Sequence, residues 1–137
     1  MARTASKQPT DGELEILKIL WDLGPAGLGK IHEVLRERRG VAITTVATML
    51  KMMLAKKLVD RGDGPRGYLW KASVSRKATV SGLIGKLVQH VFDGSAHRLV
   101  AHLVETGELD ESERKEIGEL LKSQTDKKKT AGKTGGK

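Results

Sequence analysis

The sequence predicts a mainly α-helical protein in which three helices and a β-hairpin are followed by a second set of helices. Apolar residues recur at helical spacing before residue 58 and again after residue 75. Between these regions the pattern changes to two short strands, 58–61 and 68–72, around the Gly-rich segment 62–67. Three helices followed directly by a hairpin are typical of a winged helix-turn-helix, in which the hairpin is the wing.

The first predicted helix begins at Thr10 and ends before Gly24-Pro25. The segment from Thr10 to Glu13 has the form of a capping box, in which each side chain accepts a hydrogen bond from the other residue's backbone N–H. Seven large apolar residues follow up to Leu23, so the helix must be covered on more than one side. We therefore expect it to belong to the core.

The second and third helices are predicted in close succession. The second runs from about Gly29 to Arg38, and Gly40 ends it. A brief turn leads to Thr44, which we expect to be the N-cap of a helix over 44–57. Two helices joined by a short Gly-containing turn form a helix-turn-helix.

The helix over 44–57 has two different faces. Its apolar residues follow the pattern of one buried stripe, and they are Val46, Met49, Leu50, Met53 and Leu54. The other face carries short or unbranched side chains, none of them acidic. Because a Thr hydroxyl can bond a base edge or a phosphate, this face favours a helix that enters the DNA major groove. Its candidate contacts are Thr44, Thr45, Ala47, Thr48, Lys51 and Met52. The alternative is an amphipathic core helix with a basic end.

The hairpin would add contacts to the DNA backbone or minor groove. Its loop over 62–67 is longer than a tight two-residue turn, so we expect a projecting, mobile tip. The expected phosphate contacts are Lys30, Arg36, Lys56, Arg61 and Arg66. The alternative is a plain turn at the edge of the domain.

The charge of the chain is unevenly placed. The formal net charge is +8, which favours a polyanionic partner. From Arg38 to Lys71 eight basic residues oppose two acidic ones, and from Val104 to Leu121 seven acidic residues oppose two basic ones. Residues 126–137 hold five lysines and one Asp. This distribution indicates a module that faces a polyanion, a module with an acidic surface, and a basic tail.

Three short helices after Ser75 are each apolar on one side. Such helices can scarcely bury their apolar stripes against one another, so we expect an α-helical dimerisation region and a homodimer. The candidate interface residues are Leu83, Leu87, Val91, Leu99, Val100, Leu103, Ile117, Leu120 and Leu121.

The chain thus divides into four expected parts. They are a disordered N-terminus over 1–9, a winged helix-turn-helix DNA-binding domain over 10–73, a helical dimerisation domain over 74–123, and a Lys/Gly-rich disordered tail over 124–137. The tail's lysines suit either added non-specific DNA affinity or simple solubility.

Several classes of function are disfavoured by what the sequence lacks. Without Cys there are no disulfides, thiolate metal sites or Cys nucleophiles. The four His residues show no metal-ligand spacing, so we expect no metal, no cofactor and no enzyme activity. The first residues lack a signal-peptide core, and no run approaches the roughly 20 apolar residues of a membrane helix. We expect a cytoplasmic protein without membrane insertion.

The order of parts resembles the penicillinase repressor family of bacterial transcription regulators. The resemblance covers about residues 10–122. It is carried by TDGELEILKILW, TTVATMLKMMLAKKLV, the wing strand GYLW, and FDGSAHRLVAHLVE. It implies a dimeric repressor that binds palindromic operators in double-stranded DNA.

The resemblance also implies how repression ends. Family members leave their operators when a membrane-bound metalloprotease sensor is triggered and the repressor is cut. Members cut in this way carry an Asn-Phe bond where this chain has His102-Leu103. Family recognition helices often place basic residues where this chain has Ala47 and Met52, so its operator is expected to differ. Copper sensing through C-terminal Cys residues, as in one branch of the family, is excluded.

Three other functions compete with this interpretation. A sequence-neutral architectural DNA-binding protein would suit the Lys-rich tail. A scaffold that binds only protein would use the same fold without duplex binding. An enzyme is the third rival.

Overall fold

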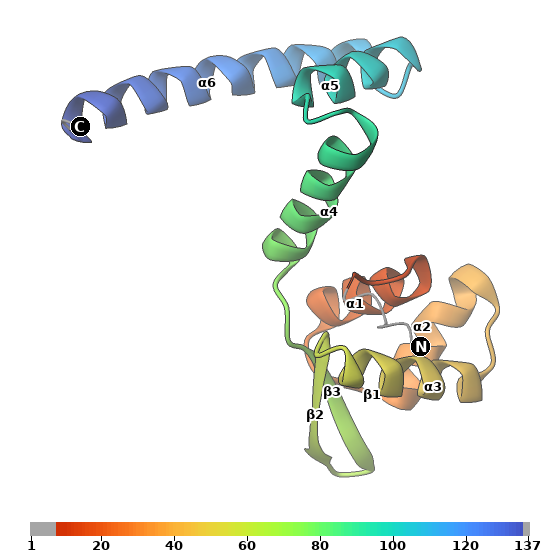
Figure 1. Ribbon diagram of the computed structural model, residues 1–137. Helices are drawn as coiled ribbons and strands as arrows, with labels where there is room; N and C mark the ends of the chain where they lie inside the picture. The colour runs from red at the N-terminus through yellow and green to blue at the C-terminus, as the bar shows by residue number, and fades with distance from the viewer. Residues whose placement is uncertain (1–7, 136–137) are drawn as a thin grey trace, which may run out of the picture. The chain divides into compact units, whose positions relative to one another are not determined.

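The computed structural model describes the backbone of residues 8–135 and the side chains of residues 8–124. Its elements are α1 (Asp11–Leu23), β1 (Ala26–Gly27), α2 (Leu28–Arg39), α3 (Ile43–Ala55), β2 (Val59–Gly64), β3 (Gly67–Ala72), α4 (Arg76–Val91), α5 (Ala96–Glu105) and α6 (Glu111–Gly135) (Figure 1). The disorder predicted for residues 1–9 falls almost entirely on residues 1–7, which lie outside the described part.

The chain divides into two compact units, one up to Gly85 and one from Lys86 onward. This division falls within α4, so the predicted boundary between 73 and 74 stays a prediction. In the first unit α1 packs on α2, α2 packs on α3, and the β2–β3 hairpin projects from the helices (Figure 1). This arrangement of three helices and a wing is the predicted winged helix-turn-helix.

The core of the first unit joins all three helices to the sheet. Its largest fully buried side chains are Ile16, Leu17, Ile31, Leu35, Val46, Leu50, Met53 and Val59. They come from α1, α2, α3 and β2 at the helical and strand spacings that the sequence displays. Burial of this set fixes the rotation of α3 about its own axis, and therefore which of its side chains face outward.

The start of α1 has the predicted capping box. The backbone N–H of Glu13 donates to Thr10 Oγ1 at 3.2 Å, and the backbone N–H of Thr10 donates to Glu13 Oε1 at 3.0 Å. At the other end Gly24 adopts a φ of 84°, a conformation that Gly reaches without steric cost. Both predicted ends of α1 are confirmed.

The turn between α2 and α3 differs in one detail from the prediction. Gly40 ends α2 in the left-handed conformation, as expected, but α3 begins at Ile43 with Ala42 as its N-cap. Thr44 is therefore inside the helix, because the carbonyl of Ala42 already accepts hydrogen bonds from the backbone N–H groups of Thr45 and Val46 at 3.1 and 3.2 Å. The expectation of Thr44 as N-cap was wrong.

The three strands form one antiparallel sheet in the order β1-β3-β2. In the β2–β3 hairpin Gly64 pairs with Gly67, so only Pro65 and Arg66 lie between the strands. The expectation of a loop longer than a two-residue turn was therefore wrong. Gly62 and Gly64 join the strand despite their turn-like composition, and Gly67 closes the turn with a φ of 120°.

Residues 74–76, which follow the wing, are held to α1 by side-chain contacts. The indole N–H of Trp21 donates to the carbonyl of Val74 at 2.9 Å. Arg76, the first residue of α4, forms an ion pair with Asp22 at 2.9 Å and lies over the Trp21 ring at 5.4 Å. These contacts hold residues 74–76 to the body of the first unit.

The second unit consists of helices whose capping signals match the sequence. Ser95 caps α5 by accepting the backbone N–H of Arg98 at 3.1 Å. Asp110 and Glu113 form a reciprocal box at the start of α6. The backbone of α6 continues to Gly135, whereas the sequence favours disorder from residue 124. A composition too polar for a core does not prevent a helix that is already nucleated from propagating.

No helix within residues 8–135 has the length and apolar content needed to cross a bilayer.

Candidate nucleic-acid interface

The outward face of α3 is the one that the sequence predicts. The buried stripe of Val46, Leu50 and Met53 turns the opposite side of the helix to solvent. The predicted contacts on that side are exposed or, for Ala47, half-buried; they are Thr44, Thr45, Ala47, Thr48, Lys51 and Met52. The face therefore carries hydroxyls, one ammonium group and no carboxylate.

Thr48 has one of its hydrogen-bonding roles already in use. Its hydroxyl donates to the backbone carbonyl of Thr44 at 3.1 Å. Because a hydroxyl has one proton and two lone pairs, the oxygen remains able to accept. In this state Thr48 presents an acceptor outward, which matches the amino groups of adenine and cytosine in the major groove.

A hollow of about 760 Å³ lies between the start of α2, α3 and the wing. We call it the wing hollow. Four cationic side chains among the predicted contacts line it, namely Lys30 of α2, Lys51 of α3, and Arg61 and Arg66 of the hairpin. Ala47 also lines it, and no Asp or Glu does. The fold thus gathers cations from positions up to 36 residues apart in the sequence around one acid-free concavity.

Aromatic side chains on the wing hold one of these cations. Arg61 lies opposite Trp70 in the β2–β3 register, so the two side chains share a face of the sheet. The Arg61 guanidinium lies 4.1 Å from the centre of the Tyr68 ring and 5.6 Å from that of Trp70. Such cation–π contacts orient the guanidinium without neutralising it. Tyr68 and Trp70 were not among the residues predicted for the site, and the strand register of the structure is what places them beside Arg61.

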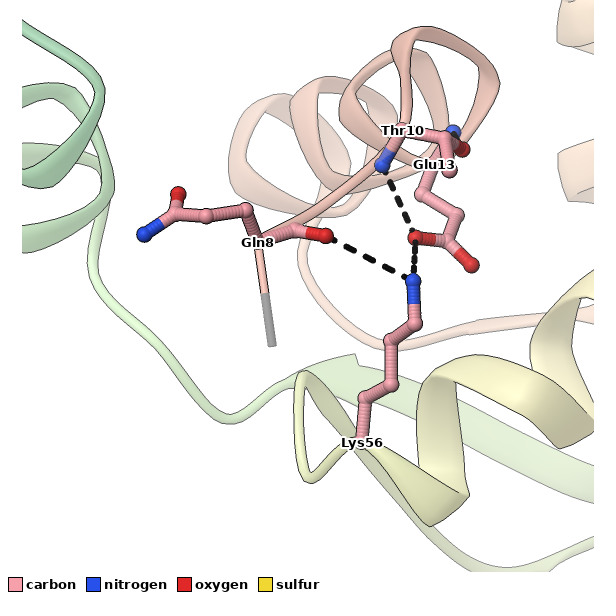
Figure 2. Close-up of polar contacts among 4 residues, drawn as sticks. All are labelled: Gln8, Thr10, Glu13 and Lys56. Carbon is pink, nitrogen blue, oxygen red and sulfur yellow. Dashed lines mark hydrogen bonds and ion pairs between the residues drawn. The ribbon is translucent and has the colours of Figure 1, made fainter. Parts of the chain in front are cut away.

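Lys56 does not belong to this surface (Figure 2). Its Nζ lies 2.8 Å from Glu13 Oε1, and it also donates to the backbone carbonyl of Gln8 at 3.5 Å. The side chains of Lys56 and Glu13 are only 12% and 4% exposed. Separating a buried pair of this kind costs about 3–5 kcal/mol, so Lys56 is not available to a phosphate. This corrects the expectation that it contacts DNA.

The remaining predicted phosphate contacts stay exposed. Arg36 lies on α2, outside the wing hollow. Lys30 lies 3.8 Å from Glu33 in a pair whose side chains are 55% and 59% exposed. A pair this long and this exposed contributes little free energy, so it does not withhold Lys30 from a stronger anion.

The residues predicted for dimerisation lie on α4, α5 and α6 without full burial. Leu83, which belongs to the first unit, is half-buried, as are Leu99, Leu103 and Ile117 in the second. The others are between 39% and 64% exposed; they are Leu87, Val91, Val100, Leu120 and Leu121.

The bond between His102 and Leu103 lies inside α5. The ring of His102 is 6.0 Å from that of Phe92. This places the position implied for cleavage in regular helix rather than in an exposed loop.

The comparisons with known proteins agree with this architecture. Residues 9–123 match the model of the family described as penicillinase repressor. The transcriptional regulator BlaI of Mycobacterium tuberculosis (strain CDC 1551 / Oshkosh) is 32% identical over 115 residues, which cover 80% of this chain and 83% of that protein. The penicillinase repressor of Bacillus licheniformis is 19% identical over 122 residues, which cover 89% and 95%.

Among solved structures, the apo form of wild-type MarR from E. coli superposes with a TM-score of 0.50 at 21% identity, over 84% of this chain and 76% of that one. This likeness concerns the fold, and it agrees with a winged helix-turn-helix. From the family match and the relatives together, the chain belongs to the penicillinase repressor family of DNA-binding transcriptional repressors.

Proposed function

We propose that the chain represses transcription as a homodimer bound to a palindromic operator, with α3 of each copy in the major groove and the wing against the backbone. The observation that carries this proposal is the acid-free outer face of α3 beside a wing that bears Arg61 and Arg66. Thr45, Thr48 and Lys51 would meet base edges, and the residues around them would meet phosphates.

The phosphate contacts in this proposal are Lys30, Arg36, Arg61 and Arg66, with Lys56 removed. If about three of them engage in each copy, a dimer neutralises about six phosphates. The logarithm of the binding constant should then fall with the logarithm of salt concentration at a slope of about −5.

The energetics of recognition favour two copies. Discrimination against the rest of a genome takes roughly 4–10 kcal/mol. One helix that offers Thr45, Thr48 and Lys51 supplies two or three contacts at the low end of about 1–3 kcal/mol each. Two copies on half-sites about one helical turn apart reach the required range.

The C-terminal helices supply the surface for that second copy. Val91 is 61% exposed, Val100 47% and Leu120 60%, although all three are apolar. Large apolar side chains this exposed on three successive helices favour an interaction surface. A twofold-related copy would present the same stripes in return, which is how an isologous interface is built.

The family resemblance supports a further part of the proposal, namely relief of repression by a membrane-bound metalloprotease sensor. The bond that would be cut, His102-Leu103, lies inside α5, so α5 must unwind before a protease can reach it. Mass spectrometry of the protein from induced cells should then find fragments that end at His102 and begin at Leu103. An intact chain during derepression would contradict this route.

Selection of bound sites from a random duplex pool tests the proposal as a whole. We expect the selected duplexes to share a palindrome whose half-sites lie about one helical turn apart. Sites without a common sequence, bound as tightly as the starting pool, would favour a sequence-neutral architectural protein instead. Absence of duplex binding even at low salt would favour a scaffold that binds only protein.

A further inference from the structure

We infer that the wing hollow is also a binding site for a small aromatic carboxylate, and that such a ligand releases the protein from DNA. The regulatory half of this inference rests on the proposed function, whereas the binding half does not. The ligand is identified only by the chemistry of the surface that would hold it.

The size and walls of the wing hollow suit a small organic molecule. Its volume of about 760 Å³ lies within the range of ligand sites, about 300–1,000 Å³. Much of its wall is apolar, and the accessible part of this wall is made by Leu28, Pro65, Tyr68 and Leu69, whereas Leu50 and Trp70 in the lining are themselves buried. Phosphates alone would gain nothing from such walls, because apolar side chains offer them no hydrogen bonds. A ligand with a flat apolar body would bury them.

The charge of the wing hollow selects an anion. Lys30, Lys51, Arg61 and Arg66 line it without any Asp or Glu. Among the described side chains, only Lys30 of these four has a carboxylate partner. Its Nζ lies 3.8 Å from Glu33 Oε1. Asp63 pairs with Tyr68 across the hairpin but is not part of the lining. Three cations therefore remain without a carboxylate partner, and an incoming carboxylate could neutralise one of them.

Arg61 is the group best placed to bind the carboxylate. The Tyr68 ring 4.1 Å away holds one face of its guanidinium, so less side-chain freedom is lost when a ligand binds. The edge of a guanidinium offers paired N–H donors that match the two oxygens of a carboxylate. An aromatic body attached to that carboxylate would extend toward Leu28 at the start of α2, whose side chain is only half-buried.

Ligand and DNA would exclude each other because they use the same cations. Arg61 cannot offer its paired N–H donors to a bound carboxylate and to a phosphate at once, and the body of the ligand would occupy the space beside Lys51 and Arg66 that DNA needs. Binding of one therefore lowers the affinity for the other by the same factor, as thermodynamic linkage requires.

Calorimetric titration of naphthoate into the full chain without DNA tests the binding half. We expect naphthoate to bind at least about tenfold more tightly than the neutral naphthalenemethanol, because only the acid pairs with Arg61. Arg61→Met and, separately, Arg66→Met should each weaken naphthoate binding, whereas Arg38→Met, an exposed Arg of α2 outside the hollow, should not. Thermal unfolding of each variant shows that it is folded. Equal affinity for acid and alcohol, no saturable heat, or unchanged affinity in both hollow variants would overturn the site.

Competition against a labelled duplex taken from the selected pool tests the regulatory half. Naphthoate should displace the duplex at concentrations set by its calorimetric affinity, and naphthalenemethanol should not. If naphthoate binds without displacing the duplex, the proposed coupling between ligand and DNA is wrong, although the ligand site in the wing hollow still stands. If no duplex binds at all, the proposed function fails, and the calorimetric result still decides whether the site exists.

Discussion

Lys56 shows how one long side chain decides between two roles. On sequence spacing it belongs to the basic end of α3, yet its ammonium group lies against Glu13 on α1, 43 positions away in the chain. The aliphatic part of a Lys side chain can lie along apolar surface while its ammonium group points either to solvent or toward a partner in the protein. No local pattern distinguishes these outcomes, because the partner is brought near only by the packing of α1 against the end of α3.

The first prediction concerns this pair. Lys56→Met should lower the free energy of unfolding by about 3 kcal/mol, because Glu13 is left buried without its cation. Lys18→Met, at an exposed position of α1, should change it by less than about 0.5 kcal/mol. Denaturant unfolding measures both. At temperatures where Lys56→Met is folded, the salt dependence of its DNA-binding constant should equal that of the parent. A shallower dependence would show that Lys56 contacts DNA.

The second prediction concerns Thr48. Thr48→Val keeps the shape and removes the hydroxyl, which we expect to cost about 1 kcal/mol in each half-site, or roughly 30-fold for a dimer on its selected site. Binding to random duplex should fall far less, because phosphate contacts carry it. Thr48→Ser retains the hydroxyl and serves as the matched control. Fluorescence anisotropy on both duplexes gives the comparison, and equal losses on the two would show that Thr48 contacts no base.

The elements of the first unit were largely predictable from local signals. The capping box, the apolar stripes and the glycines at 24 and 40 each specify a start, a face or an end. The misplaced start of α3 and the tight wing turn have a common reason. Both depend on backbone hydrogen bonds, at Ala42 and between Gly64 and Gly67, whose exact positions the composition of these segments does not specify.

The sequence predicted the cations of the wing hollow but not their arrangement around one concavity. Its cations are conspicuous in the sequence as residues on consecutive elements. That they surround one concavity, and that Tyr68 and Trp70 support Arg61, follows from the strand register and from how the hairpin stands beside α3. Tertiary placement of this kind leaves no trace in periodicity.

The third prediction belongs to the wing as an element. Arg66 lies in a two-residue turn at the tip, where we expect it to contact phosphate. Arg66→Ala should therefore lower the affinity for the selected duplex and for random duplex by similar factors. In a dimer it should also reduce the magnitude of the salt slope by about 2. Arg38→Ala removes an equal charge from α2, away from the hollow, and should leave the slope nearly unchanged. Titrations over a series of salt concentrations measure the slope. If the slope of Arg66→Ala matches the parent, the wing tip does not touch the backbone.

At the scale of the whole molecule, the elements before and after residue 75 differ in how they bury their apolar side chains. The elements up to β3 bury large side chains completely, whereas the described side chains of α4, α5 and α6 include none that is buried. Apolar side chains left uncovered in this way favour association with a second copy. The homodimer expected from the sequence stays a prediction.

The fourth prediction tests that association. Leu103→Asp places a charge in the apolar stripe of α5, and burying it in a dimer interface would leave it unpaired. We expect sedimentation to find monomers at concentrations where the parent is dimeric. Ser112→Asp adds the same charge in the first turn of α6, where a helix tolerates it, and should leave the dimer intact. A dimer that persists in Leu103→Asp would place the interface elsewhere.

The carboxylate of Glu13 serves two helices at once, since it caps the start of α1 and pairs with Lys56, the C-cap residue of α3. During divergence of the family, a replacement at either position alone would leave a buried polar group unmatched. Exchange of both for a well-packed apolar pair is by contrast tolerable. Positions 13 and 56 are therefore expected to change together in descendants of this fold, or not to change at all.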